Sequence, residues 1–175
     1  MRRQIHQQTD PGTLFNMQSL PGTYALVLPA VSNRSIVIGK LGTLEIKPGF
    51  YLYVGSAFGP GGLRARITHH RKNSSRPHWH MDYLSVYLHP NEVWYSYDRE
   101  PREHQWVKVL AGTKGASIPL GGFGSSDCGC TSHLYFFDHR PCAKSFRRKI
   151  HANVDNHEKI FIENLTGTKP NAQIE

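Results

Sequence analysis

Short runs of alternating apolar and polar residues fill the first third of the chain, a pattern typical of half-buried β-strands. Turn residues separate the runs; Lys47-Pro48-Gly49, for example, closes the third of them. The pattern predicts strands over residues 24–28, 35–38, 43–46 and 50–54. Shorter runs predict further strands at 81–88 and 93–97, and a last strand at 134–137.

Two stretches instead show the three-to-four-residue spacing of an amphipathic helix. The first runs from Leu63 to Lys72, behind a glycine-rich loop at residues 55–62. The second begins at Pro101, a favoured first helical position, and stops before Gly112, a favoured position just past a helix end. Strands and helices together predict an α+β domain in which helices flank a small mixed or antiparallel sheet.

Neither end of the chain shows a clear periodic pattern of apolar residues. We interpret residues 1–20 as a flexible arm and residues 141–175 as a basic, polar tail, which leaves a single domain over 21–140. No apolar run approaches the ~20 residues that span a bilayer. No apolar segment follows the basic start, so the sequence predicts a cytoplasmic protein that does not enter a membrane.

Charge favours a polyanionic partner. The chain carries 21 Lys and Arg residues against 13 Asp and Glu residues, a formal charge of +8. Clustered cations bind nucleic acids by releasing counterions from the phosphates. The odd number of cysteines, three, argues against a disulfide framework and for reduced thiols or a metal site.

Two basic side chains of the first helix fall on its packing side. Leu63 and Ile67 mark the buried stripe, and Arg66 and His70 lie within about 60° of it at ~100° per residue. A buried, unpaired cation is costly. Two interpretations are open. In the first, Arg66 reaches solvent or pairs with a core carboxylate, and His70 is an ordinary core histidine. In the second, the two side chains belong to a functional site.

An acidic residue occupies the matching place in the second helix. Glu103 shares the apolar stripe of Trp106, Val107 and Leu110. Three readings stay open: a carboxylate favoured by the helix dipole, the partner of Arg66, or a metal ligand. Two helices that each aim a charge at one sheet predict a site between them.

Tyrosines on the predicted strands could complete such a site. Tyr24 opens the first strand, and Tyr51 and Tyr53 share one face of the fourth. A strand tyrosine commonly serves packing alone, but it can transfer a proton when neighbouring cations lower its pKa.

The order of these residues resembles the GIY-YIG nuclease family. Gly22-Thr23-Tyr24 and Tyr53-Val54-Gly55 are the two triplets, followed by a helix bearing Arg66 and His70 and a later helix with Glu103. The resemblance covers residues 21–111. It is strongest to the small stand-alone Uri-type branch, which is related to the nuclease domain of the bacterial excision-repair incision protein.

That branch carries segments similar to His78-Trp79-His80-Met81-Asp82-Tyr83 and Gly122-Phe123-Gly124-Ser125-Ser126-Asp127-Cys128. Two departures stand out. Ser56 follows the second triplet where the repair relatives often have lysine, so one auxiliary cation is missing, and the predicted 35–46 hairpin lengthens the spacing between the triplets.

The resemblance implies a metal-dependent endonuclease that hydrolyses phosphodiester bonds in DNA. It implies that Tyr24 is the general base or orients the attacking water, and that Tyr53 hydrogen-bonds the scissile phosphate or shares the base role. Arg66 would stabilise charge on the phosphate oxygens, and His70 would assist proton transfer. Glu103 would hold one divalent ion, Mg²⁺ or Mn²⁺.

Basic residues of the first predicted helix and the segment after it are expected to follow the DNA backbone. They are Arg64, His69, Arg71, Lys72, Arg76, His78 and His80. Small nuclease modules of this kind often depend on a partner protein for targeting. One alternative is a nucleic-acid-binding module of the same fold without catalysis.

A second alternative is a zinc-dependent hydrolase. His78, His80 and Asp82 alternate, so in an extended segment they would share one face as metal ligands.

A third group of residues near the end of the predicted domain could bind zinc: Cys128, Cys130 and His133, with Cys142 further along. The Cys-x-Cys spacing is tighter than in common zinc sites. We therefore favour a buried structural turn in which Ser126 and Asp127 satisfy backbone groups.

Overall fold

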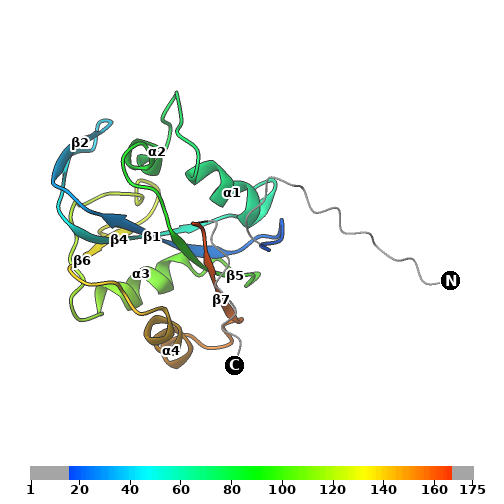
Figure 1. The fold of residues 1–175 in the computed structure, drawn as a ribbon. Coiled ribbons are helices and arrows are strands. Elements are labelled where there is room, and N and C mark those ends of the chain that lie inside the picture. Colours follow the sequence, from blue (N-terminus) through cyan, green and yellow to red (C-terminus); the bar gives the residue numbers. More distant parts are fainter. Residues whose placement is uncertain (1–15, 167–175) are drawn as a thin grey trace, which may run out of the picture.

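The computed structural model describes residues 16–166, and Figure 1 shows their arrangement. Most of the predicted N-terminal arm lies outside these residues. The part that is described does not stand apart from the domain, because Met17 is buried and the backbone N–H of Leu63 donates to the Leu20 carbonyl.

A five-stranded antiparallel sheet forms the centre of the domain. Its strands are ordered β6 (Leu134–Phe137), β4 (Gly49–Ser56), β1 (Thr23–Ala30), β5 (Glu92–Ser96) and β7 (Ile160–Asn164). A separate hairpin is formed by β2 (Arg34–Ile38) and β3 (Gly42–Ile46). The predicted α+β class is confirmed, and the strands predicted before the first helix are all present.

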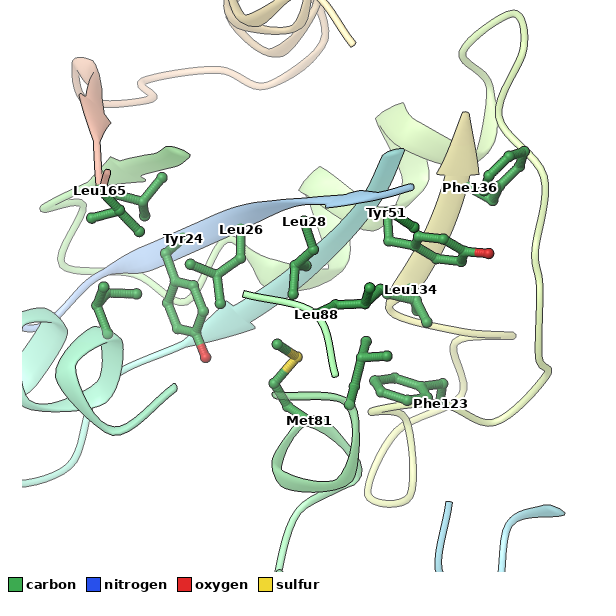
Figure 2. Close-up of a cluster of buried hydrophobic side chains, with 14 of the residues drawn as sticks. Tyr24, Leu26, Leu28, Tyr51, Met81, Leu88, Phe123, Leu134, Phe136 and Leu165 are labelled. Carbon is green, nitrogen blue, oxygen red and sulfur yellow. The ribbon is translucent and has the colours of Figure 1, made fainter. Parts of the chain in front are cut away.

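Helices cover both faces of the sheet (Figure 1). One face packs against α1 (Gly62–His70), α2 (His80–Ser85) and the hairpin, and the other against α3 (Glu103–Ala111) and α4 (Ala143–Asn153). Alternate residues of β1 serve the two layers: Tyr24 and Leu26 enter the first core, which Figure 2 shows, and Ala25 enters the second. Among the described residues, none of the helices is long and apolar enough to cross a membrane.

The segment predicted as a strand at 81–88 instead contains most of α2 (His80–Ser85), followed by a turn. Met81 and Leu84 are buried three residues apart, which is a helical spacing. The Asp82 carboxylate accepts the backbone N–H groups of His78 and Trp79, at 2.9 and 3.0 Å, and thereby caps the first turn of α2. The prediction was wrong because a single capping side chain outweighs a short apolar run.

The structure also differs from the prediction of a polar tail over residues 141–175. This segment contains α4, whose Phe146 and Ile150 enter the second core, and β7, which pairs with β5. Phe146, Ile150 and Val154 are apolar residues at the four-residue spacing of a helix. The many basic residues between them make the segment polar in overall composition, so the helix was not predicted.

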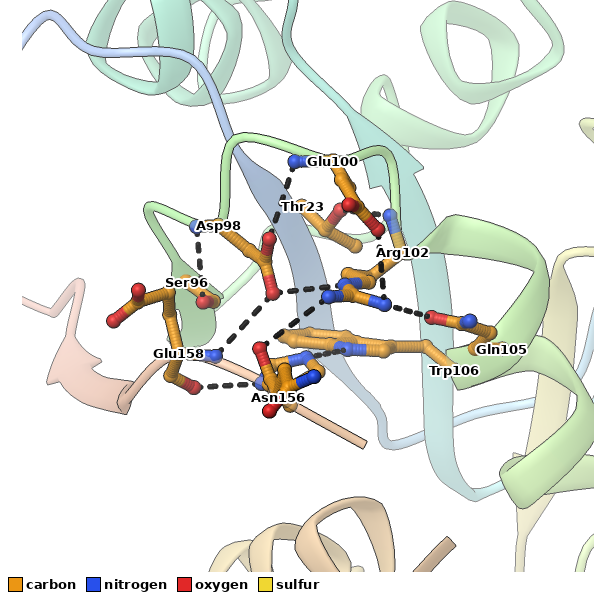
Figure 3. A network of polar contacts seen from close by, with 10 residues as sticks. Thr23, Ser96, Asp98, Glu100, Arg102, Gln105, Trp106, Asn156 and Glu158 are labelled. Atoms are coloured by element: carbon orange, nitrogen blue, oxygen red, sulfur yellow. Dashed lines mark hydrogen bonds and ion pairs between the residues drawn. The ribbon is translucent and has the colours of Figure 1, made fainter. Parts of the chain in front are cut away.

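Hydrogen bonds around the buried Arg102–Asp98 ion pair fasten the C-terminal segment to the start of α3 (Figure 3). The Arg102 guanidinium donates from Nε to Asp98 at 2.8 Å and from its second NH₂ group to the Asn156 carbonyl at 3.4 Å. The Arg102 backbone N–H donates to the Thr23 hydroxyl at 3.0 Å. The network fixes the residue directly before Glu103 against β1.

If α4 belongs to the core, shortening Ile150 should destabilise the protein. We expect Ile150→Ala to lower the free energy of unfolding by about 2–5 kcal/mol, the usual cost of such a cavity. Urea denaturation measures this. Arg148→Ala, on the exposed side of the same helix, should change it by about 0.5 kcal/mol or less. Equal values for both variants would contradict an integral α4.

Candidate active site

The register of β1 and β4 positions the first tyrosine. Tyr24 lies opposite Gly55, which has no side chain to occupy the space. A Cβ atom at Gly55 would lie 2.6 Å from Cζ of Tyr24, so only glycine leaves room for this ring. The ring points away from the sheet (Figure 2), and its hydroxyl lies 2.7 Å from Nε2 of His70 on α1.

Tyr53 joins this pair from the neighbouring strand. It lies two residues before Gly55 and therefore on the same face of β4. Its ring centre is 6.4 Å from that of Tyr24 and 6.0 Å from that of His70. Tyr24 and His70 are buried, whereas Tyr53 is partly exposed. The structure thus brings together three residues from three separate elements that the sequence singled out.

All three groups are uncharged at neutral pH, and desolvation widens the margin for each of them. Desolvation raises the pKa of Tyr24 well above its ordinary value, with a further contribution from Tyr53, while the nearby Arg66 cation opposes the rise. Desolvation also raises the pKa of Tyr53. Burial, reinforced by Arg66 and His69, lowers the pKa of His70 to about 3. The resting site therefore holds a neutral phenol hydrogen-bonded to a neutral imidazole.

Arg66 lies beside this cluster and faces a cavity. Its guanidinium carbon is 4.3 Å from the centre of the Trp79 ring, a cation–π contact. Within residues 16–166, Arg66 forms no ion pair, so of its possible roles the pairing with a core carboxylate is not found. A cavity of about 260 Å³ lies between Arg66, His69, Trp79 and the glycine-rich loop. This arrangement leaves a cation available to an anion.

Glu103 pairs with a histidine and not with Arg66, the pairing that was one of its three possible roles. Its Oε1 lies 2.6 Å from Nδ1 of His133, and Ser56 also hydrogen-bonds the carboxyl group. Burial would raise the pKa of Glu103, but His133 and Ser56 outweigh it and lower the pKa. The negative charge of Glu103 in turn helps to raise the pKa of both Tyr24 and Tyr53. Glu103 is therefore an ionised carboxylate at the edge of the tyrosine cluster.

The expected DNA-binding side chains divide into two groups. Arg64 donates from Nε to the Met17 carbonyl at 2.9 Å, and Arg71 donates to the Leu165 carbonyl at 3.1 Å, so both also hold the fold together. Three other members are exposed: Lys72, Arg76 and His78.

His69 and His80 also make contacts within the protein. Nε2 of His69 lies 2.7 Å from the Asp82 carboxylate, and Nδ1 of His80 accepts the backbone N–H of Gly124 at 3.0 Å. His69 remains partly exposed at the cavity.

The predicted zinc ligands His78, His80 and Asp82 do not share a face. The alternation assumed an extended segment, but α2 begins at His80. The Asp82 carboxylate is occupied by the helix cap and by His69. The geometric basis of the zinc-hydrolase alternative is therefore wrong.

The turn after Phe123 also differs from its prediction. Ser126 and Asp127 are exposed, and within the described part of the chain neither side chain satisfies a backbone group. Backbone hydrogen bonds hold the turn instead, including Cys128 N–H to the Ser125 carbonyl. Asp127 therefore has no structural contact of the kind expected.

The thiols are brought next to a histidine that the sequence did not single out. Ligand atoms of Cys128, Cys130, His133 and His104 all lie within 4.8 Å of one another. Cys142, the remaining cysteine, is not in this group and stands exposed at the start of α4. The one local signal for His104 is its place directly after Glu103 at the beginning of a helix.

A family model described as "Domain of unknown function DUF123" matches residues 23–156. The chain belongs to this family. No curated protein and no solved structure shows significant similarity to the chain. The DUF123 match includes the tyrosine cluster, Glu103 and α4. The family domain therefore extends beyond residue 140, the C-terminal boundary predicted from the sequence.

Because His70 is neutral when folded, acid should destabilise the protein through this residue. Below pH 6.5 the unfolded chain protonates His70, whereas the folded chain does so only near pH 3. As the pH is lowered from 6.5 to about 3, the free energy of unfolding should decrease more steeply in the wild type than in His70→Gln. The difference in slope should reach about 1.4 kcal/mol per pH unit. Identical pH profiles from denaturant titrations would contradict the assignment.

The space above Gly55 can be tested in the same way. Without a clash, alanine in a strand stabilises relative to glycine. Because a Cβ would strike the Tyr24 ring, we expect Gly55→Ala to destabilise the protein by about 1–3 kcal/mol. Gly59→Ala, where nothing lies within 4 Å, is the control and should stay within about 0.5 kcal/mol of the wild type.

Proposed function

We propose that this DUF123 protein is a metal-dependent endonuclease of the GIY-YIG type that hydrolyses phosphodiester bonds in DNA. The observation that carries the proposal is the meeting of Tyr24, Tyr53 and His70, with Arg66 and Glu103 at the border of the cluster. These residues come from four elements far apart in the sequence. They are also the residue types that hydrolysis of a phosphate ester requires.

Arg66 is the group suited to receive the scissile phosphate. It lines the cavity, and stacking on Trp79 holds the guanidinium without neutralising it. A guanidinium can donate two parallel hydrogen bonds to phosphate oxygens and stabilise the charge that builds up on them during attack.

Tyr24 and His70 are suited to carry the proton of the attacking water. The water proton passes to the Tyr24 oxygen while the Tyr24 proton passes to Nε2 of His70, across the existing 2.7 Å contact. The water oxygen then forms its bond to phosphorus as the bond to the leaving oxygen breaks. A bound phosphate anion raises the pKa of His70 and so favours this transfer.

The residues around Glu103 fit a divalent ion. The carboxylate is ionised and remains partly exposed, at 19% of its side chain. Mg²⁺ is commonly held by one or two carboxylates, several waters and the phosphates of the substrate, so a single protein ligand suffices. A Mg²⁺ or Mn²⁺ ion held there would stabilise negative charge on the leaving oxygen.

DNA is the substrate that the charge favours. The chain has a formal charge of +8, and Lys72, Arg76 and His78 project from the segment between α1 and α2. We further propose that the protein belongs to the Uri-type branch and acts in the cytoplasm. A partner protein would direct it to its DNA target.

Cleavage assays test the proposal directly. Plasmid, branched and single-stranded DNA are incubated with the protein in Mg²⁺, Mn²⁺ or EDTA. We expect cleavage with either metal and none in EDTA, and a loss of at least about 100-fold in Arg66→Ala and in Glu103→Ala. Arg148→Ala, an exposed arginine on α4, is the matched control and should cleave normally. If all variants bind DNA equally and none cleaves, the protein is a binding module instead.

The exposed cations should appear in the salt dependence of DNA binding. Each phosphate contact contributes about 0.9 to the slope of log Kobs against log salt. Lys72→Ala with Arg76→Ala should lower that slope by about two in fluorescence titrations. Lys144→Ala with Arg148→Ala removes the same charge from α4 and should leave the slope unchanged. Equal slopes for both double variants would contradict a DNA contact at the segment between α1 and α2.

A further inference from the structure

Four side chains of metal-binding type converge beside Glu103, which contacts one of them, His133. Cys128, Cys130 and His133 come from the long segment between α3 and α4, and His104 comes from the first turn of α3. One ligand atom from each lies within 4.8 Å of the others. Two thiols and two imidazoles form the ligand set that zinc takes in closed structural sites.

The spacing of these atoms suits a tetrahedral ion. Bonds of about 2.3 Å to sulfur and 2.0–2.1 Å to nitrogen place neighbouring ligand atoms about 3.3–3.8 Å apart. Sγ of Cys128 lies 3.3 Å from Nε2 of His133. This pair already has the spacing of a loaded site, and the remaining ligand atoms, within 4.8 Å of one another, need to approach by at most about 1–1.5 Å.

His133 is prepared for the role of a ligand. It is 2% exposed, and its backbone is fixed on both sides: its N–H donates to Phe123 at 2.7 Å and its carbonyl accepts from Val54 at 3.0 Å. Nδ1 faces Glu103 at 2.6 Å, which directs Nε2 toward the thiols. A carboxylate behind a histidine is the usual outer support of a zinc ligand.

We propose that His104, Cys128, Cys130 and His133 bind one zinc ion in a closed structural site. The ion fastens the segment after Phe123 to the beginning of α3, and through His133 it holds Glu103 beside the tyrosine cluster. It is separate from the Mg²⁺ or Mn²⁺ of the proposed nuclease reaction, since all four of its positions are filled by protein.

Metal binding tests the site without any activity assay. The full chain is purified under reducing conditions, stripped with a chelator and titrated with Zn²⁺ or Co²⁺. We expect one ion per chain, with the absorption bands of tetrahedral, thiolate-bound Co²⁺. Cys130→Ser and His104→Ala should bind zinc at least tenfold more weakly in competition with a chromophoric chelator. His104 is exposed, so its replacement should not prevent folding.

Two matched controls separate a site from unspecific binding. Cys142→Ser removes the exposed cysteine outside the cluster, and His139→Ala removes an exposed histidine. Both should keep one ion at wild-type affinity. The proposal is overturned if the wild type takes up no stoichiometric zinc, if Cys130→Ser and His104→Ala keep full affinity, or if the controls lose it. None of these results depends on whether the protein cleaves DNA.

Discussion

The pairing of β1 with β4 in one register is the constraint on which the candidate site depends. It sets Tyr24 opposite Gly55 and puts Tyr53 on the same face two residues away. A slip of one residue would turn one of the tyrosines toward the layer of α3 and α4. The glycine supplies the space and α1 supplies His70, so the 2.7 Å hydrogen bond to Tyr24 is a product of strand register and helix packing together.

Glu103 connects the two layers of the domain. The Arg102–Asp98 ion pair fixes the start of its helix, and His133 and Ser56 hold its carboxylate. Ser56, the last residue of β4, contributes a side-chain hydrogen bond to the Glu103 carboxylate. Because one oxygen of Glu103 contacts a histidine of the thiol cluster, loss of that cluster would also disturb the carboxylate proposed to hold the catalytic ion.

The sequence predicted the features that follow from local hydrophobic periodicity. It did not predict contacts between residues that are far apart along the chain. Alternation identified the first four strands, and helical spacing placed Arg66 and His70 on the side of α1 that faces the site. The stacking of Arg66 on Trp79 could not be predicted, because the two meet only through folding. His104 was missed for the same reason: its place after Glu103 does not indicate a metal ligand, and the thiols that make it one lie more than 20 residues further along the chain.

We propose above that the Tyr24–His70 pair carries the proton of the attacking water. Single-turnover cleavage of end-labelled DNA by wild-type protein and by Tyr24→Phe, with DNA affinity measured in parallel, tests it most directly. Phenylalanine keeps the ring that fills the space over Gly55 and removes only the hydroxyl. If Tyr24 transfers the proton, Tyr24→Phe should bind DNA with unchanged affinity and cleave it at least about 100-fold more slowly. Equal cleavage rates at equal affinity would contradict it.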